Sequence, residues 1–370
     1  MNEIVLQHSM KRIPNKKIFT HSLLLWNKNT NKRQMPWKGI ADPYKIWLSE
    51  IMLQQTRVEQ GTAYYNRFIE KFPTVDKLAL ADDDVVFKMW EGLGYYSRCK
   101  NLMATAKIIA FDYKGIFPAN YNAILKLKGI GPYTAAAIAS FAFKLPYAVV
   151  DGNVTRVISR FFAVEKPIDT NDGKKYFAEL AQSLLHTEDS ATYNQAIMDF
   201  GATICKPRQP LCDICLLQNK CGAYAKDLTK VLPLKEKKLL KRNRYFYYII
   251  VEQQGKIFVR KRTEKDIWQN LWEFILIEID EKLYAEAFIK SKAFKDLFIG
   301  FNISIKTSVF YKQQLTHQTI EGLFLHVTAD TTYKNKNFTA LKKGEIKTLA
   351  FPRFITGFLE KQEELRILKG

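Results

Sequence analysis

Residues 1–230 carry apolar side chains at a spacing of three or four positions, which predicts a largely helical region. The spacing is clearest in residues 44–72, where Asp42 is expected to cap the first helix and Pro43 to open it. Glycine and proline separate the later segments. Further helices are predicted near residues 82–90, 97–113, 120–127, 132–143, 153–163, 173–186 and 190–203.

The pattern changes after residue 240, where apolar runs bounded by turn residues predict strands. These runs are YFYYIIVEQQGKIFVRKR with a turn at Gln254-Gly255, then LWEFILIEI, ISIKTSVFY and TIEGLFLHVTA, with a helix expected over 281–298. We expect no strand before residue 240. The chain therefore divides into a mainly α domain (1–230, opening with a basic arm over 1–20), a basic linker (231–243) and an α+β domain (244–370).

Composition favours a polyanionic partner. Lys+Arg number 57 against Asp+Glu 37, a net charge of +20, which suits nucleic acid but also fits a soluble protein that is merely basic. MNEIVLQHSMKRIPNKK has no apolar core and no long apolar run follows it, so neither a secretory signal nor a membrane helix is expected. We expect a cytoplasmic protein with reduced thiols.

The segment LKGIGPYTAAAIASFAF (127–143) places Gly129 and Gly131 in a tight turn between two predicted helices. The free N–H groups at the start of the second helix suit a phosphate oxygen. An ordinary helix-packing turn would give the same glycines. In a basic chain, however, the form L-x-G-x-G-x-x-T-A resembles the helix-hairpin-helix of DNA repair proteins, here over 119–143.

Four of the five cysteines gather in residues 205–221 with the spacing C-x6-C-x2-C-x5-C. Structural zinc sites usually show two short pairs, whereas four thiolates so close in sequence can also wrap an iron–sulfur cluster. The spacing alone leaves zinc and iron–sulfur open. The four candidate ligands are Cys205, Cys212, Cys215 and Cys221.

Two carboxylates occupy unusual sequence contexts. Glu50 stands among apolar residues in LSEIML, so partial burial and a raised pKa are expected, although such a glutamate usually lies on a solvated face. Asp151 in VVDGNV has the context of an ordinary helix N-cap. Two carboxylates in different environments can divide the tasks of donating a proton and of stabilising positive charge.

Five motifs in consistent order over residues 35–221 closely resemble the MutY-type adenine DNA glycosylases of the endonuclease III superfamily. They are MPWKGIADPYKIWLSEIMLQQT, WEGLGYYSRCKNL, LKGIGPYTAAA, VDGNVTRV and YNQAIMDFGATIC. The resemblance implies a helix-hairpin-helix glycosylase fold with a 4Fe–4S cluster on the four cysteines. It also implies that Glu50 protonates adenine and that Asp151 stabilises the sugar cation, supported by Asn153 and Tyr133.

Tyr133 departs from the strand-cutting members of the superfamily, which carry a lysine at this position to form a Schiff base. A phenol cannot form an imine, so the resemblance implies a monofunctional glycosylase. The alternatives are a bifunctional endonuclease III-like enzyme acting on oxidised pyrimidines and a non-catalytic, metal-stapled DNA-binding protein.

The resemblance also assigns DNA contacts. It implies that Gln55, Leu93 and Tyr95 penetrate the duplex and that Thr56 contacts the opposing base, while Arg33, Trp37 and Gln195 surround the extruded adenine. Lys38 receives no role, and Tyr96 and Cys99 are expected to pack in the core. Lys206, Arg208 and Lys220 of the cysteine loop are expected to face DNA phosphates.

The second half resembles the Nudix-like C-terminal domain of the same family more weakly. It has no glutamate cluster around a Gly-Arg-Glu core, so a recognition role fits better than nucleotide hydrolysis. QLTH (314–317) stands where the family places a Phe-Ser-His loop, which implies that Thr316 and His317 recognise 8-oxoguanine. The expected partner is duplex DNA with an adenine:8-oxoguanine mispair, bound by a monomer associated with the nucleoid.

Overall fold

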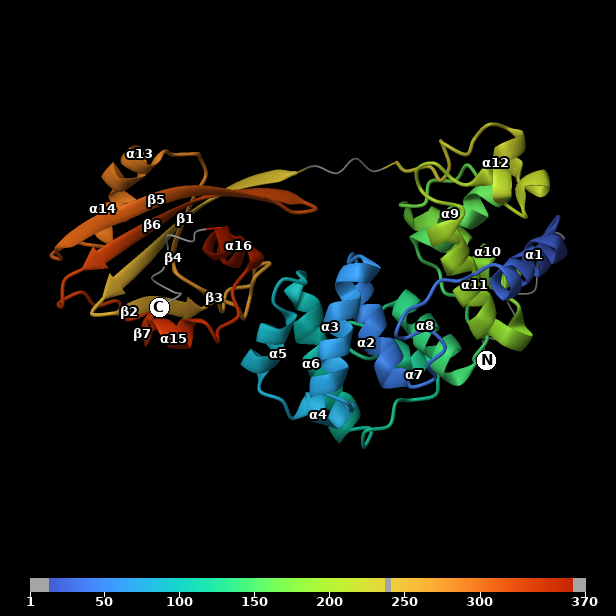
Figure 1. The fold of residues 1–370 in the computed structure, drawn as a ribbon, viewed down its shortest axis with the longest axis horizontal. Helices are drawn as coiled ribbons and strands as arrows, with labels where there is room; N and C mark the ends of the chain where they lie inside the picture. Colours follow the sequence, from blue (N-terminus) through green and yellow to red (C-terminus); the bar gives the residue numbers. More distant parts are fainter. Residues whose placement is uncertain (1–12, 237–240, 362–370) are drawn as a thin grey trace. The chain divides into compact units, whose positions relative to one another are not determined.

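The structure is a computed structural model that describes residues 13–236 and 241–361. The chain forms two compact units (Figure 1). The first contains the described residues of 1–70, 74–76 and 105–237, and the second those of 71–73, 77–104 and 238–370. Part of the predicted basic arm (1–12) and part of the predicted linker (237–240) lie outside the described residues. No helix in the described part of the chain is long and apolar enough to cross a membrane.

The mainly helical character of the N-terminal part is confirmed, as is the expected helix cap at Asp42. Asp42 accepts hydrogen bonds from the backbone N–H groups of Tyr44 and Lys45, and Pro43 is the first helical residue. The helices are α1 (Lys16–Asn29), α2 (Pro43–Leu53), α3 (Val58–Lys71), α4 (Val75–Ala79), α5 (Asp83–Trp90), α6 (Tyr96–Phe111), α7 (Tyr121–Leu125), α8 (Pro132–Phe143), α9 (Gly152–Phe161), α10 (Asn171–Leu184), α11 (Ser190–Thr203) and α12 (Gly222–Ala225), with short 3-10 helices at Thr187–Asp189, Cys212–Ile214 and Gln218–Lys220.

Two helical details differ from the sequence-based expectation. Residues 16–20 of the predicted arm belong to α1, where Phe19 is buried with Leu23 and Trp26 along one helical face. The continuous pattern over 44–72 is interrupted between α2 and α3, because Gln55 adopts a left-handed conformation with φ 57°. A helix cannot continue through such a residue, although no glycine or proline marks the break.

A core of the first unit lies between α1, α9, α10 and α11, where α11 contacts α1 and α9, and α9 contacts α10 (Figure 1). At the start of α9, α11 approaches so closely that a Cβ added at Gly201 would lie 2.7 Å from the Cβ of Asn153. Arg156 fixes the same junction by donating from Nη2 to the carbonyl oxygen of Gly201 at 2.7 Å. This contact sets the position of the residues that open α9.

The second unit is built on a seven-stranded mixed sheet with the order β3-β2-β1-β6-β5, in which β4 also pairs with β1 and β7 with β2. β1 and β6 are parallel and the other pairs are antiparallel. The α+β class is therefore confirmed. The strands are β1 (Arg242–Gln253), β2 (Lys256–Lys261), β3 (Trp272–Glu273), β4 (Ile275–Ile279), β5 (Ile303–Gln314), β6 (Gln318–Ala329) and β7 (Thr339–Lys342).

Helices cover both faces of this sheet, which explains why the centre of β1 is apolar throughout. Tyr247 stacks on Phe288 of α13 (Ala285–Lys290), whereas Tyr248 faces Phe354 of α16 (Arg353–Lys361). The expected helix over 281–298 is divided into α13 and α14 (Lys292–Asp296), because Ser291 is extended and caps the second helix. A short helix, α15 (Lys343–Ile346), follows β7.

Residues 77–104 pack within the second unit, although the sequence places them in the N-terminal domain. Glu91 Oε1 accepts a hydrogen bond from the backbone N–H of Phe351 at 2.8 Å, and Lys88 donates to the carbonyl oxygen of Leu349 at 2.9 Å. Tyr96 and Cys99 are buried, as expected. The division of the chain at the linker stays a prediction.

We predict that Gly201→Ala lowers the free energy of unfolding by about 1–3 kcal/mol, because the added methyl group overpacks the junction of α11 with Asn153. Thermal or urea unfolding measures the change. Gly152→Ala is the matched control, since a Cβ there meets no heavy atom within 4 Å. Equal stability of Gly201→Ala and the control would contradict the close helix approach.

Candidate functional site

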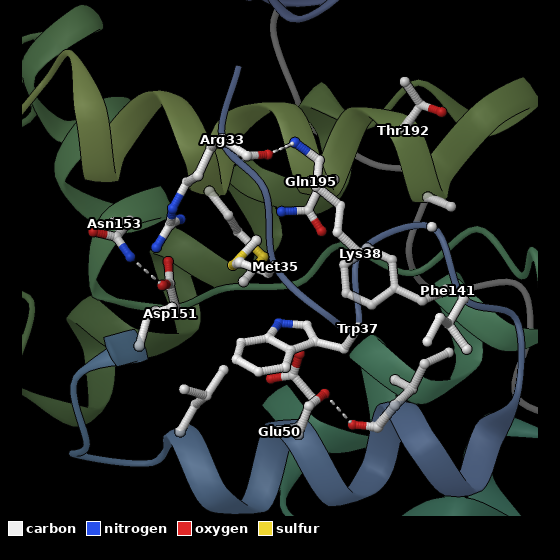
Figure 2. Close-up of a pocket in the computed structure, with 18 of the residues that line it drawn as sticks. Arg33, Met35, Trp37, Lys38, Glu50, Phe141, Asp151, Asn153, Thr192 and Gln195 are labelled. Atoms are coloured by element: carbon white, nitrogen blue, oxygen red, sulfur yellow. Dashed lines mark hydrogen bonds between the residues drawn. The ribbon is translucent and has the colours of Figure 1, made fainter. Parts of the chain in front are cut away.

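A cavity of about 380 Å³ opens in the first unit (Figure 2). Its walls come from α2, α8, α9 and α11 and from the loop that precedes α2. The structure brings together all of the predicted catalytic and adenine-pocket residues here. They are Arg33, Trp37, Glu50, Tyr133, Asp151, Asn153 and Gln195.

Glu50 lies on α2 with only 6% of its surface exposed, so its burial is deeper than the sequence led us to expect. Tyr133 of α8 donates its phenolic hydroxyl to Glu50 Oε2 at 2.6 Å. Burial raises the pKa of Glu50 to about 7; the Tyr133 hydrogen bond opposes the rise and the negative charge of Asp151 adds to it. Burial together with Glu50 raises the pKa of Tyr133 well above its ordinary value, so Tyr133 remains a phenol donor.

Asp151 combines the two interpretations that its sequence context allowed. It is the N-cap of α9, where Oδ1 accepts from the backbone N–H of Val154 at 2.7 Å, and it also lines the cavity. Asn153 donates to Oδ2 at 2.6 Å and accepts from Arg156 in turn. Burial raises the pKa of Asp151, while these hydrogen bonds and the Arg156 charge oppose the rise. The two carboxyl groups therefore have different surroundings: a largely apolar one for Glu50 and a donor-rich one for Asp151.

No sequence motif indicated a role for Asp199 of α11, whose side chain is fully buried behind the cavity. Its carboxylate accepts hydrogen bonds from residues of the loop before α2 and from one residue of its own helix. Oδ1 accepts from Arg33 Nη1 (2.8 Å) and Gln195 Nε2 (3.1 Å), and Oδ2 accepts from Asn31 Nδ2 (2.9 Å) and Lys38 Nζ (2.9 Å). Lys38, which received no role, thus lines the cavity. The available signal was the four-residue spacing of Gln195 and Asp199, which places both on one helical face.

Two of the predicted DNA contacts of the first unit, Gln55 and Thr56, lie at the same opening. Thr56 lines the cavity, and Gln55 lines an adjoining recess that also includes Glu50 and Asp151. Gly129 turns the chain between α7 and α8 with φ 76°, and Gly131 is the N-cap of α8. Gly131 has no side chain to bond the first helical N–H groups, which leaves them available to an anion.

The predicted DNA and lesion contacts of the second unit are exposed to different extents. Leu93 is buried with 5% exposure, whereas Tyr95 is 38% exposed. The hydroxyl groups of Tyr95 and Thr316 share a hydrogen bond of 2.5 Å. Thr316 and His317 are exposed in the turn between β5 and β6, which a hydrogen bond from Leu315 N to Gln318 O closes.

The four clustered cysteines are free thiols that line one small, apolar cavity. Burial raises the pKa of Cys215 to about 11 and also raises the pKa values of Cys212 and Cys221, and the neighbouring thiols add to each rise. Arg160 reaches the loop and donates to the carbonyl oxygens of Lys206 and Pro207. In residues 13–236 and 241–361, no group of three or more potential ligands has the arrangement of a metal site. Four thiols around one cavity are a donor set that suits a thiolate-bound centre.

Family models match both parts of the chain. Residues 48–184 match the HhH-GPD superfamily of base excision DNA repair proteins, and residues 246–361 match the NUDIX domain. A curated adenine DNA glycosylase from Buchnera aphidicola subsp. Baizongia pistaciae is 37% identical over 262 residues, which cover 70% of this chain and 73% of that protein. The adenine DNA glycosylase of Homo sapiens is 37% identical over 236 residues, 60% of this chain and 43% of its own.

Solved structures resemble the helical part. A thermostable thymine-DNA glycosylase matches with a TM-score of 0.53 and 32% identity, over 57% of this chain and 97% of its own. An endonuclease III, solved in a non-covalent complex with DNA, matches with a TM-score of 0.50 and 18% identity, over 59% of this chain and 99% of its own. The second likeness shows a shared fold.

The raised pKa of Glu50 predicts a pH-dependent stability. The folded protein holds a proton between about pH 4.5 and 7 that the unfolded chain releases, so the free energy of unfolding falls as pH rises through this window. Glu50→Gln removes this loss. We expect its stability relative to the unmodified protein to increase by roughly 1–3 kcal/mol from pH 5 to pH 8 in urea unfolding.

A second variant tests the cause of this effect. Tyr133→Phe removes the hydrogen bond that lowers the pKa of Glu50, so the midpoint of the pH-dependent loss should move above its position in the unmodified protein. A pH-independent difference between Glu50→Gln and the unmodified protein would contradict the buried, proton-holding state of Glu50.

Proposed function

The chain belongs to the adenine DNA glycosylases, which act in base excision repair, and from this membership we propose that it releases adenine opposite 8-oxoguanine by hydrolysis, without cutting the strand. The observation that carries the proposal is the facing pair of carboxyl groups, Glu50 and Asp151, in one cavity with different hydrogen-bond surroundings. A glycosidic bond between base and sugar requires two such groups with separate tasks.

Glu50 supplies the acid in this proposal. A pKa of about 7 keeps a large share of Glu50 protonated at neutral pH, so it can donate to the departing adenine. Once ionised, it can accept a proton from the attacking water. Tyr133 holds the carboxyl group in place from α8 throughout. Asp151, bonded by donors that favour its charged form, then stabilises the positive sugar.

The monofunctional part of the proposal rests on the amines near the cavity. Position 133 holds a phenol, which cannot form a Schiff base with the sugar. Lys38 also lines the cavity, but its Nζ is bound to Asp199 and to the carbonyl oxygen of Arg33. Lys144, at the end of α8, is the other lysine of the cavity lining and provides a control below.

Recognition of 8-oxoguanine is assigned in the proposal to Thr316 and His317. Both are exposed in the β5–β6 turn, and Thr316 bonds to Tyr95, which is itself exposed. A hydroxyl group and an imidazole can donate to and accept from the edge of an oxidised base. We propose that a monomer uses this turn on chromosomal DNA while the cavity of the first unit holds the adenine.

We further propose that Cys205, Cys212, Cys215 and Cys221 hold a 4Fe–4S cluster. All four thiols line one cavity, as a shared centre requires. When bound, such a cluster would cross-link the loop after α11. In this proposal Lys206, Arg208 and Lys220 of the loop face DNA phosphates, and the reaction itself needs no electron.

The function is tested with duplexes that carry adenine opposite 8-oxoguanine, adenine opposite guanine, or thymine opposite guanine. We expect release of free adenine, fastest opposite 8-oxoguanine, with strand breaks only after alkali. Glu50→Gln should bind the first duplex and release adenine at least about 100-fold more slowly. The thymine duplex is included because the thymine-DNA glycosylase is 32% identical.

Each part of the proposal has its own contrary result. Unchanged turnover by Glu50→Gln would remove it as the acid. Strand breaks before alkali would contradict hydrolysis alone, and their loss in Lys144→Ala would identify the amine. A Thr316→Val variant that keeps its full preference for 8-oxoguanine over guanine would contradict the assignment of the β5–β6 turn.

The cofactor is tested by the colour and metal content of the purified protein. We expect broad visible absorption, with about four irons and four sulfides per chain. Cys215→Ser should lose the absorption and melt at a lower temperature, whereas Cys99→Ala should keep the absorption, since Cys99 is buried elsewhere. A colourless protein with one bound zinc would contradict the cluster.

A further inference from the structure

We infer that Asp199 makes the cavity selective for a base with an amino group, by fixing which end of the Gln195 amide faces that base. The inference rests on the proposed adenine pocket and extends it to a residue that does not itself need to touch the base. Asp199 is therefore a positioning residue.

The contacts of Asp199 determine the orientation of Gln195. All four groups bound to its carboxylate are hydrogen-bond donors, two of them cationic: Arg33, Lys38, Asn31 and Gln195. A carboxylate flanked by Arg33 and Lys38 acts only as an acceptor. The Gln195 amide must therefore present its nitrogen to Asp199 Oδ1, where the two atoms are 3.1 Å apart. The reverse orientation would bring two acceptors together.

The other end of the amide is the group available to a ligand. With Nε2 held by Asp199, the carbonyl oxygen Oε1 is directed away from the carboxylate, and Gln195 lines the cavity. Figure 2 shows Gln195 reaching in from α11 and Glu50 from α2, on opposite sides of the Trp37 indole. In the described part of the chain, no protein group donates to Oε1. The cavity thus presents an acceptor on this wall.

Adenine matches this arrangement and 6-oxopurines do not. The edge of adenine that carries N7 also carries the N6 amino group, so it requires one donor and one acceptor from the protein. Protonated Glu50 is the donor and Gln195 Oε1 is the acceptor. Guanine and hypoxanthine carry a carbonyl oxygen at position 6, which would face Oε1 as a second acceptor. An unpaired acceptor in a dry site disfavours such a base.

The contacts of Asp199 hold its carboxylate in one orientation. Its two oxygens are shared between the loop before α2 and α11, so rotation of the carboxylate would break contacts with Arg33 and Lys38 together. Full burial of the Asp199 side chain excludes water that could replace these donors. The Gln195 amide is therefore already oriented for an amino group before a base enters the cavity.

The test is single-turnover base release from three duplexes that carry adenine, purine or hypoxanthine at one position opposite guanine. Asp199→Asn keeps the shape of the side chain but offers one donor and one acceptor. The Gln195 amide can then rotate so that its nitrogen and oxygen exchange places. We expect the adenine-to-hypoxanthine rate ratio of Asp199→Asn to fall by about tenfold or more from that of the unmodified protein. Intrinsic differences between the bases cancel in this comparison.

Lys38→Gln is the matched control, because Lys38 bonds to Oδ2 while Gln195 bonds to Oδ1. It should lower the rates of all three bases by a similar factor and leave their ratios unchanged. An unchanged adenine-to-hypoxanthine ratio in folded Asp199→Asn would overturn the inference.

A second variant covers the case in which Asp199→Asn does not fold. Gln195→Met removes the acceptor, so adenine should lose rate relative to purine, which has no 6-amino group; an unchanged adenine-to-purine ratio would overturn the inference. Failure of the proposed function can be told apart from failure of this inference. If Glu50 is not the acid, Glu50→Gln still releases adenine, and this result does not depend on the rate ratios of Asp199→Asn.

Discussion

The hydrogen bond from Tyr133 to Glu50 is the contact on which the rest of the site depends. It joins α2, which carries the buried acid, to α8, which follows the Gly129–Gly131 turn. A helix N-terminus suited to a phosphate and a carboxyl group suited to proton transfer thus belong to one packed helix pair. In the proposed function, a phosphate bound at the turn and a base bound at Glu50 would lie at a separation that this helix pair fixes.

Three carboxyl groups lie in or behind one cavity, and each has different surroundings. Glu50 has a phenol and apolar neighbours, and burial raises its pKa to about 7. Asp151 caps α9 and receives several donors that offset part of its burial. Asp199 is fully buried and is surrounded by two cations and two amides. These surroundings suit the roles that the proposed function gives the three groups: acid for Glu50, charge stabiliser for Asp151 and positioning residue for Asp199.

The sequence predicted the parts of this arrangement that local pattern controls. The helices followed from apolar periodicity, and Glu50 and Asp151 from their motif contexts. The helix break at Gln55 was not predicted, because a left-handed residue other than glycine cannot be recognised from the sequence. The role of Asp199 was not predicted, because it depends on hydrogen bonds from Arg33 and Lys38, which lie more than 150 residues away in the chain. The association of residues 77–104 with the second unit likewise depends on contacts such as Glu91 with Phe351, which no local pattern encodes.

Two acidic residues of the second unit are paired with arginines inside the fold. Glu273 of β3 is fully buried and its carboxylate is bonded by Arg260 and Arg262. Asp266 is bonded by Arg244 and Arg262, and these contacts lower its pKa. A carboxylate that satisfies an arginine has fewer oxygen lone pairs for a divalent cation, and the arginine repels that cation. In this NUDIX-like unit Glu273 and Asp266 therefore stabilise the fold through arginines, while the β5–β6 turn, to which the proposed function assigns the lesion contact, is exposed.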